Sequence, residues 1–329
     1  EDLERKKQPQ LYFVVIAAIF VLLVGLRSRQ VGLDTKNYYL IYRYYIESPF
    51  LKVRFGLFNE TGYALLNWFC ANYFGGFQTV LFVAAILSIV PVAILIYKHS
   101  DMPMLSWFFY VAFAFYTFLF SGVRQGIAMG ITVLAFLCIP KKKVIWFYVL
   151  VLVAMSFHNT AAIVLPMYWL SKLKIDLKTM LLFIIGGILL YVFRSPVLEF
   201  LSNYSTNYYF ETDTGGNMQF LFIILMLITA FVMKESLTES NSVNQLAFFT
   251  VATTAAVFMM LKVNPTLFRL YFYYYIYVIL LIPNQIKAIK AQSVRYGFTI
   301  AYLFVGAYFF YTRVLTADLD LIPYHFFWQ

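Results

Sequence analysis

Residues 11–26 read LYFVVIAAIFVLLVGL, and residues 27–39 continue with RSRQVGLDTKNYY. The first stretch is apolar throughout and approaches the roughly 20 residues that a transmembrane helix needs. The second stretch brings several charged residues to the end of that helix, and charges beside a membrane need water, a ligand or ion pairs. Polar residues return at 58–63, FNETGY, around Glu60. We therefore expect the region from Arg27 onward to line a cleft outside the membrane core.

The composition of the chain is that of a membrane protein. The 329 residues are 62% hydrophobic and only 12% charged, whereas a soluble globular protein is usually about a quarter charged. Apolar runs recur from end to end, which predicts an all-α polytopic integral membrane protein. With 27 tyrosines and 36 phenylalanines, the sequence also has enough aromatic rings for interfacial belts and for a water-filled cavity in which rings stack on sugars.

We predict a single transmembrane domain over residues 1–329, with about 11 transmembrane helices. The apolar segments that predict them lie at 11–26, 78–97, 104–120, 122–139, 144–171 (as two short helices), 179–193, 217–233, 243–262, 268–283 and 295–313.

Several segments are expected to do something other than cross the membrane. The fourteen residues Thr61–Phe74 are too few for a crossing and predict a re-entrant helix, and the aromatic segment Asn37–Phe50 predicts an interfacial one. Loops 27–60 and 194–217 are expected to be extracytoplasmic and to form part of the cleft. The segment 144–171 is too long for one crossing and short for two, so we expect two short helices that meet near His158. Broken helices are tolerated at membrane depth where they line a cavity.

The net charge of +10 bears on orientation and on partners. The basic residues sit in loops between apolar segments, so nucleic acid is not expected as a partner, whereas membrane lipids or a phosphate-bearing lipid substrate are. Alternation from a cytoplasmic N-terminus puts most lysines inside, as the positive-inside rule requires, and most arginines outside. Guanidinium binds phosphate oxygens in a bidentate manner, so this arginine-rich outer face predicts a phosphate site.

Arginines supply the candidate phosphate ligands. Arg124, with Gln125 beside it, follows an apolar segment, where a charge costs roughly 2.5–3.5 kcal/mol. It is predicted to bind an anionic headgroup, and the alternatives are an arginine that extends to the interface or one paired with a structural carboxylate. Arg27 or Arg29 is expected to join it, although either can be merely interfacial. Arg269 precedes the aromatic segment RLYFYYYIY and is a further candidate clamp, with the same interfacial alternative.

Three residues are candidates for proton transfer. His158, at the expected helix break, suits a general base or a phosphate contact, and its alternative role is to cap the helix end. Glu60 can accept a proton from an acceptor hydroxyl or simply pair with an arginine. Asp34 can act in the same way or form the N-cap of the next helix. Tyr38 and Tyr63 are candidate contacts for sugars or supports for the charged groups.

Metal and cofactor chemistry is not predicted. The sequence has no P-loop, GxSxG, HExxH or metal-ligand spacing of cysteine and histidine. Glu199, Glu211 and Asp213 of the long loop are candidate ligands of a divalent cation, but the loop has no DxD motif and no tight acidic cluster, so a metal site is not the favoured interpretation. Cys70 and Cys138 lie in apolar segments and are expected to be small buried side chains.

The ordered motifs resemble the EpsG-like family of bacterial polysaccharide proteins, which is related in kind to Wzy repeat-unit polymerases. They are VGLDTKNYY after an arginine, ETGY, SGVRQGIA, SFHNTA, and Arg269 before a tyrosine-rich segment, and the closing IPYHF is similar too. Nearly the whole chain is covered. The first motif departs from the family form GTDT, because Leu33 stands where threonine is expected, so a hydroxyl contact is missing there.

The resemblance implies a GT-C-like membrane glycosyltransferase. It would polymerise undecaprenyl-diphosphate-linked oligosaccharide repeat units into an exopolysaccharide, capsule or O-antigen at the outer face of the bacterial cytoplasmic membrane, without metal or other cofactor. Other polysaccharide-assembly membrane proteins are expected partners. The alternatives are a transporter or flippase of lipid-linked oligosaccharide, which predicts an inverted repeat, and a non-catalytic assembly partner, which predicts arginines paired with carboxylates.

Overall fold

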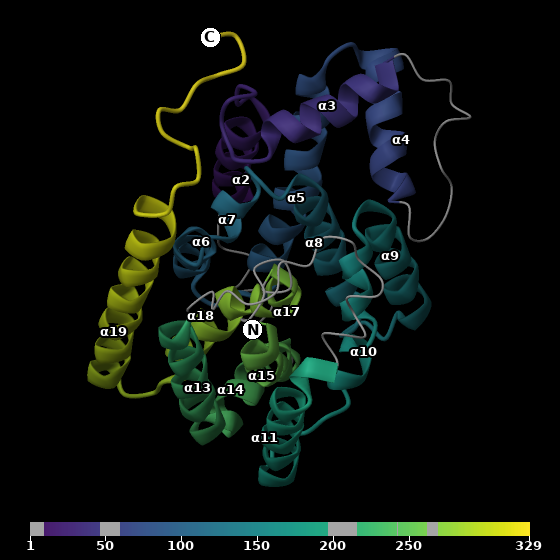
Figure 1. Cartoon of the computed structure of the whole chain (residues 1–329). Helices are drawn as coiled ribbons and strands as arrows, with labels where there is room; N and C mark the ends of the chain where they lie inside the picture. The colour runs from purple at the N-terminus through teal and green to yellow at the C-terminus, as the bar shows by residue number, and fades with distance from the viewer. Residues whose placement is uncertain (1–9, 47–59, 197–215, 242, 262–268) are drawn as a thin grey trace. The chain divides into compact units, whose positions relative to one another are not determined.

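The computed structural model describes residues 10–46, 60–196, 216–241, 243–261 and 269–329 (Figure 1). The described residues are helical with connecting turns, and they contain one isolated β-bridge, between Arg27 and Phe326, and no strand. The predicted all-helical class is therefore confirmed. The candidate cation ligands Glu199, Glu211 and Asp213 lie outside the described residues.

Two compact units make up the chain. The first consists of residues 1–98, 107–165 and 304–329, and the second of residues 99–106 and 166–303. Whether they behave as one transmembrane domain stays a prediction.

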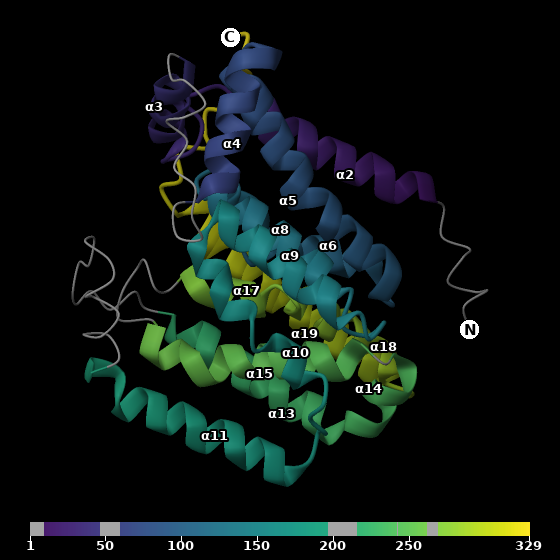
Figure 2. The same cartoon turned by 90° about the vertical axis from the view of Figure 1, so that its right-hand side faces the viewer.

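The first unit begins with α2 (Gln10–Gly25), whose end is followed by the polar turn and by α3 (Thr35–Ile46). The rest of this unit is built from α4 (Thr61–Phe69), the π-helical turn η2 (Cys70–Phe74), α5 (Phe77–His99), most of α6 (Pro103–Ala112), α7 (Phe115–Phe118), α8 (Val123–Phe136), α9 (Val144–Phe157) and the 3-10 turn η3 (Asn159–Val164). Helices α8 and α9 lie side by side (Figure 2), α4 contacts α9, and α3 packs against α4 and η2.

Small residues set the packing inside the first unit. Gly130 in α8 faces α5 so closely that a Cβ there would lie 2.0 Å from the carbonyl oxygen of Leu87. Gly62 in α4 meets α9 in the same way, since a Cβ would lie 2.4 Å from Ser156 Oγ. Gly130 therefore lets α5 approach α8 closely, and Gly62 brings the start of α4 against the end of α9.

The second unit contains α10 (Met167–Leu170), α11 (Leu177–Val192), α13 (Asn217–Val232), α14 (Lys234–Ser240), α15 (Val243–Leu261), η4 (Arg269–Tyr271), α17 (Phe272–Tyr275), α18 (Val278–Ala288) and the first part of α19 (Gln292–Phe310), which the π-helical turn η5 (Tyr311–Leu315) follows. Helix α11 buries none of its residues, and its exposed side chains are mostly leucine and isoleucine. Such a surface suits lipid rather than water. Tyr271 and Tyr273–Tyr275 are buried, so they pack inside this unit.

Two helices in the described part, Phe77–His99 and Gln292–Leu315, are long and apolar enough to cross a membrane, and several shorter apolar helices accompany them. The predicted continuous helix over 104–120 is interrupted, because Ala114 adopts a left-handed conformation (φ 64°) between α6 and α7. The predicted helix over 268–283 is likewise divided among η4, α17 and α18. The break at His158 is present, although η3 and α10 replace the second helix that the sequence predicted.

Candidate functional site

Three segments of the first unit converge on the carboxylate of Glu60. Its Oε2 forms an ion pair with Nη1 of Arg124, in the first turn of α8. Its Oε1 lies 2.6 Å from Nδ1 of His158, at the end of α9. Their side chains keep 15% (Glu60), 36% (Arg124) and 23% (His158) of their exposure, so the cluster is open to a ligand as well as internally paired.

The backbone of Glu60 is strained in a way that serves these contacts. Glu60 is the N-cap of α4 and has left-handed dihedral angles, φ 48° and ψ 44°. A side chain other than glycine in such a conformation costs of the order of 1–3 kcal/mol. Two charge-assisted contacts offset that cost. Strain of this kind concentrates at functional sites, so both the conformation of Glu60 and its partners make it a candidate site residue.

His158 reaches Glu60 because α9 stops at it. Its dihedral angles are extended, φ −155° and ψ 117°, while its N–H still donates to the carbonyl of Ala154 at 3.0 Å. An ionised carboxylate accepts hydrogen bonds only, so Nδ1 of His158 carries the hydrogen that faces Glu60. Nε2 is then the ring nitrogen that can accept a proton.

Two tyrosines support the cluster. Tyr38 in α3 is buried, and the guanidinium carbon of Arg124 lies 5.8 Å from the centre of its ring. Tyr63 in α4 is buried as well, and its ring packs edge-on against Tyr38 at 5.8 Å. Of the two roles predicted for these tyrosines, their burial agrees with support for the charged groups.

Glu60 is ionised at neutral pH. Burial raises the pKa of its carboxyl, but the hydrogen bond with His158 and the positive charge of Arg124 outweigh burial, so the pKa lies below its ordinary value. The pairing of Arg124 with Glu60 matches an alternative that the sequence left open for both residues.

Arg27 has a structural position. Its side chain is 1% exposed and donates to the carbonyls of Val24 and Phe120. Burial lowers the pKa of Arg27 to about 10, so it remains charged at neutral pH. Thr35 Oγ1 donates to the same Phe120 carbonyl at 3.1 Å. Gly32 (φ 94°) approaches that carbonyl so closely that a Cβ would lie 2.3 Å from its oxygen. The VGLDT motif thus joins the end of α2 to the turn before α8.

The other predicted residues of the first unit are distributed around this joint. Arg29 is exposed, with its guanidinium carbon 4.2 Å from the centre of the Tyr39 ring. Asp34 is partly buried, and among the described residues its carboxylate forms no ion pair with Arg124 or His158. Gln125 is buried in α8. None of the hydrogen bonds found among the described residues links Asp34 or Gln125 to Glu60.

Arg269 belongs to the second unit, where it is the exposed first residue of η4. Its predicted convergence with Arg124 therefore stays a prediction. Within the described ranges, no group of three or more histidine, cysteine, aspartate and glutamate side chains is arranged to hold a metal ion.

Sequence reasoning missed the role of the C-terminal tail. The N–H of Ser28 donates to the carbonyl of His325 and that of Phe327 to Leu26, both at 2.9 Å. Tyr324 Oη donates to the carbonyl of Leu23 at 2.6 Å. The tail thus holds the turn that contains Arg27. The only indication of this role in the sequence is the IPYHF motif, because a contact between residues almost a whole chain apart leaves no local pattern.

The family model described as "EpsG family" matches residues 10–326. This match confirms the family resemblance of the motifs. No curated protein and no solved structure matches the chain. The family and the apolar helices together identify a membrane protein.

Proposed function

Because the chain belongs to the EpsG family of polysaccharide polymerases, we propose that it is a metal-independent membrane glycosyltransferase acting on undecaprenyl-diphosphate-linked oligosaccharide. It joins repeat units into an exopolysaccharide, capsule or O-antigen. The reaction takes place at the outer face of the bacterial cytoplasmic membrane. The observation that carries the proposal is the convergence of an imidazole, a carboxylate and a guanidinium on one partly exposed point.

The reaction uses each of these groups in a different way. The hydroxyl oxygen of the acceptor sugar forms a bond to C1 of the donor sugar, and its proton passes to Nε2 of His158. The bond between C1 and the diphosphate oxygen breaks, and its electron pair leaves with the lipid diphosphate. Glu60 holds the imidazole through Nδ1 and stabilises the imidazolium that forms, as a carboxylate does in hydrolase triads.

The leaving group carries most of the developing negative charge, and guanidinium groups are suited to it. Arg124 uses Nη1 for Glu60, but guanidinium has five N–H donors, and this side chain keeps 36% of its exposure. Arg124 therefore binds the diphosphate with its remaining donors. In the proposal Arg29 and Arg269 add further positive charge, and Asp34 orients the acceptor. The buried residues Arg27 and Gln125 support the end of α2 and the start of α8.

The proposed topology follows from the charges of the sequence. The N-terminus is cytoplasmic, about 11 helices cross the membrane in a GT-C-like arrangement, and the Glu60 cluster opens to the outside. Other polysaccharide-assembly membrane proteins act beside it.

Purified protein incubated with the organism's lipid-linked repeat unit tests the activity directly. Wild-type protein is expected to yield a polymer ladder, while His158→Ala and Arg124→Ala are expected to lose chain growth at least 10²-fold. Arg43→Ala, an exposed arginine of α3 outside the cluster, is the matched control and retains the ladder.

Two other functions predict different outcomes. A non-catalytic assembly partner is favoured by one observation, the pairing of Arg124 with a carboxylate. It predicts no ladder from purified wild-type protein. A flippase predicts movement of the lipid-linked unit across vesicles without any new glycosidic bond. Wild-type ladders from the well-folded His158→Ala and Arg124→Ala variants would remove both residues from the site.

A further inference from the structure

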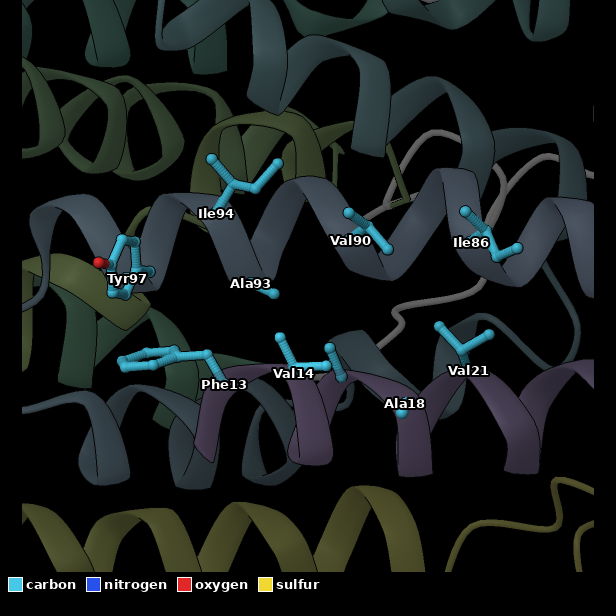
Figure 3. A pocket seen from close by; sticks show the side chains of 10 residues that line it. Phe13, Val14, Ala18, Val21, Ile86, Val90, Ala93, Ile94 and Tyr97 are labelled. Carbon is cyan, nitrogen blue, oxygen red and sulfur yellow. The ribbon is translucent and has the colours of Figure 1, made fainter. Parts of the chain in front are cut away.

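A groove without charged residues runs between α2 and α5 in the first unit, with a volume of about 540 Å³ (Figure 3). One wall is the face of α2 from Phe13 to Val21, and the other is the face of α5 from Ile86 to Tyr97. Val14 and Val21 point from α2 towards α5, and Ala93 and Tyr97 lie on the side of α5 that faces α2. All of them are apolar except for the hydroxyl of Tyr97.

The two helices touch at one end of the groove and beyond the other. At one end the rings of Phe13 and Tyr97 pack edge to face, with centroids 5.0 Å apart. At the other end Gly25 meets Phe82, where a Cβ would lie 2.8 Å from Phe82 Cδ2. The wall from residue 13 to residue 21 is roughly 12 Å long, at 1.5 Å per residue. The groove therefore covers somewhat less than half of the roughly 30 Å hydrocarbon core of a membrane.

The residues beside the groove do not fill it. Ala17, Ala18 and Ala93 leave room along its length, and Val14 on its rim is 62% exposed. An apolar slot of this shape on a membrane helix pair takes a hydrocarbon chain. A single slot fits one chain better than the paired chains of a glycerophospholipid.

The charge at the end of α2 indicates what is attached to that chain. Beyond Gly25 the helix is followed by Arg29, which is exposed and lies over the ring of Tyr39. Arg27 and Thr35 bind the same Phe120 carbonyl, which ties this end of α2 to the segment that leads into Arg124. An amphiphile in the groove would thus place an anionic headgroup beside Arg29, at the end of the unit that carries Arg124.

We propose that this groove holds the isoprenoid chain of the lipid-linked substrate, with its diphosphate next to Arg29. The inference rests on the proposed function for the identity of the lipid. The groove would fix the position of the diphosphate relative to Glu60 and His158, because α2 binds the chain and the turn that follows α2 binds the headgroup.

Photo-labelling of the full chain in nanodiscs tests the groove without requiring any polymerisation. The probe is a long-chain polyprenyl diphosphate with a diazirine in its chain, and the readout is the labelled fraction of peptides containing residues 13–21 and 86–97. Saturable labelling of both peptides is expected, with competition by the unlabelled polyprenyl diphosphate. A phosphatidylglycerol probe with a diazirine in its acyl chain is expected to label without saturation.

Substitutions within the groove sharpen the test. Ala18→Phe fills the slot from α2 and is expected to lower the affinity for the probe about tenfold, while Ile19→Phe on the other face of the same helix leaves it unchanged. Val90→Phe fills the slot from α5 and gives a second reading if the first variant folds poorly.

Charge variants identify the end at which the headgroup lies. Arg29→Ala is expected to weaken binding of the probe, and Lys98→Ala, beside Tyr97 at the opposite end, is not. Equal saturation by phosphatidylglycerol, labelling outside both peptides, unchanged affinity in both filled variants, or dependence on Lys98 in place of Arg29 would each overturn the proposal. If saturable labelling persists while purified protein makes no polymer, the proposed function fails and the groove remains.

Discussion

The Glu60 cluster of the first unit and the Asn284 network of the second unit are both built from distant segments, but they are built differently. Asn284 donates to the carbonyl of His99 at 2.8 Å and to Asn244 Oδ1 at 2.7 Å, and it accepts from the N–H of Asp101 at 2.7 Å. Asn284 and Asn244 are fully buried and neutral. The Glu60 cluster instead holds charged groups that keep part of their exposure.

This difference is the one expected between a polar group that stabilises a fold and a polar group that binds a ligand. A buried amide with all its partners stabilises one arrangement and offers nothing to solvent. A partly exposed carboxylate on a strained backbone, shared by an arginine and a histidine, has the features of a functional site.

Glu60→Gln should lower activity strongly while the protein still folds. The amide keeps the size of the side chain but removes the charge that fixes the His158 tautomer and stabilises the imidazolium. We expect chain growth from lipid-linked units to fall about 10²–10³-fold, as measured by initial rates of purified protein. Glu235→Gln, an exposed glutamate of α14, should leave the rate unchanged. Equal rates for both variants would reduce Glu60 to a structural role.

Asn284→Ala should do the opposite. It removes the hydrogen bonds of Asn284 with the Asp101 N–H, Asn244 Oδ1 and the His99 carbonyl, so we expect the free energy of unfolding in detergent to fall by roughly 3 kcal/mol. The rate per folded molecule should stay near that of the wild type. Asn72→Ala, an exposed asparagine that bonds the carbonyl of Trp68, should cost much less. A loss of rate without a loss of stability would contradict the comparison.

Acid should weaken the Glu60 cluster before the Asn284 network. Because the pKa of Glu60 is lower in the folded protein than in the unfolded chain, its contribution is fully present above the unfolded value, about 4.3. That contribution is lost as the pH falls through the folded value. The stability advantage of the wild type over Glu60→Gln should therefore be constant near neutrality and shrink below about pH 4.3. Thermal unfolding of both proteins from pH 7 to pH 3 measures it, and a gap that widens in acid would reverse the assigned sign.

Tyr324→Phe should have the smallest effect. It removes the hydrogen bond from the tail to the carbonyl of Leu23 and leaves the ring in place, so we expect a loss of about 1 kcal/mol. Hydrogen exchange at the amide of Ser28, which bonds the His325 carbonyl, should become faster. Tyr308→Phe, on the exposed face of α19, is the control. Unchanged exchange in both variants would mean that the backbone contacts of the tail suffice without the hydroxyl.

The sequence by itself determined the helical class, the family, the break at His158 and the candidates Glu60, Arg124 and His158. The helical class and the break follow from composition and from the lengths of the apolar segments, and the candidates follow from residue types that are costly in a membrane. The family follows from the resemblance of the ordered motifs. All of these are local properties of the sequence.

Only the tertiary structure decided which candidates meet. It paired Glu60 with both Arg124 and His158, buried Arg27 against the Phe120 carbonyl, and set the tail beside the first turn. It also interrupted the apolar segment at Ala114, where no neighbouring proline or glycine predicts a break. Such contacts depend on where helices stop and how closely glycines let them approach. Those distances arise between segments and cannot be found within any one of them.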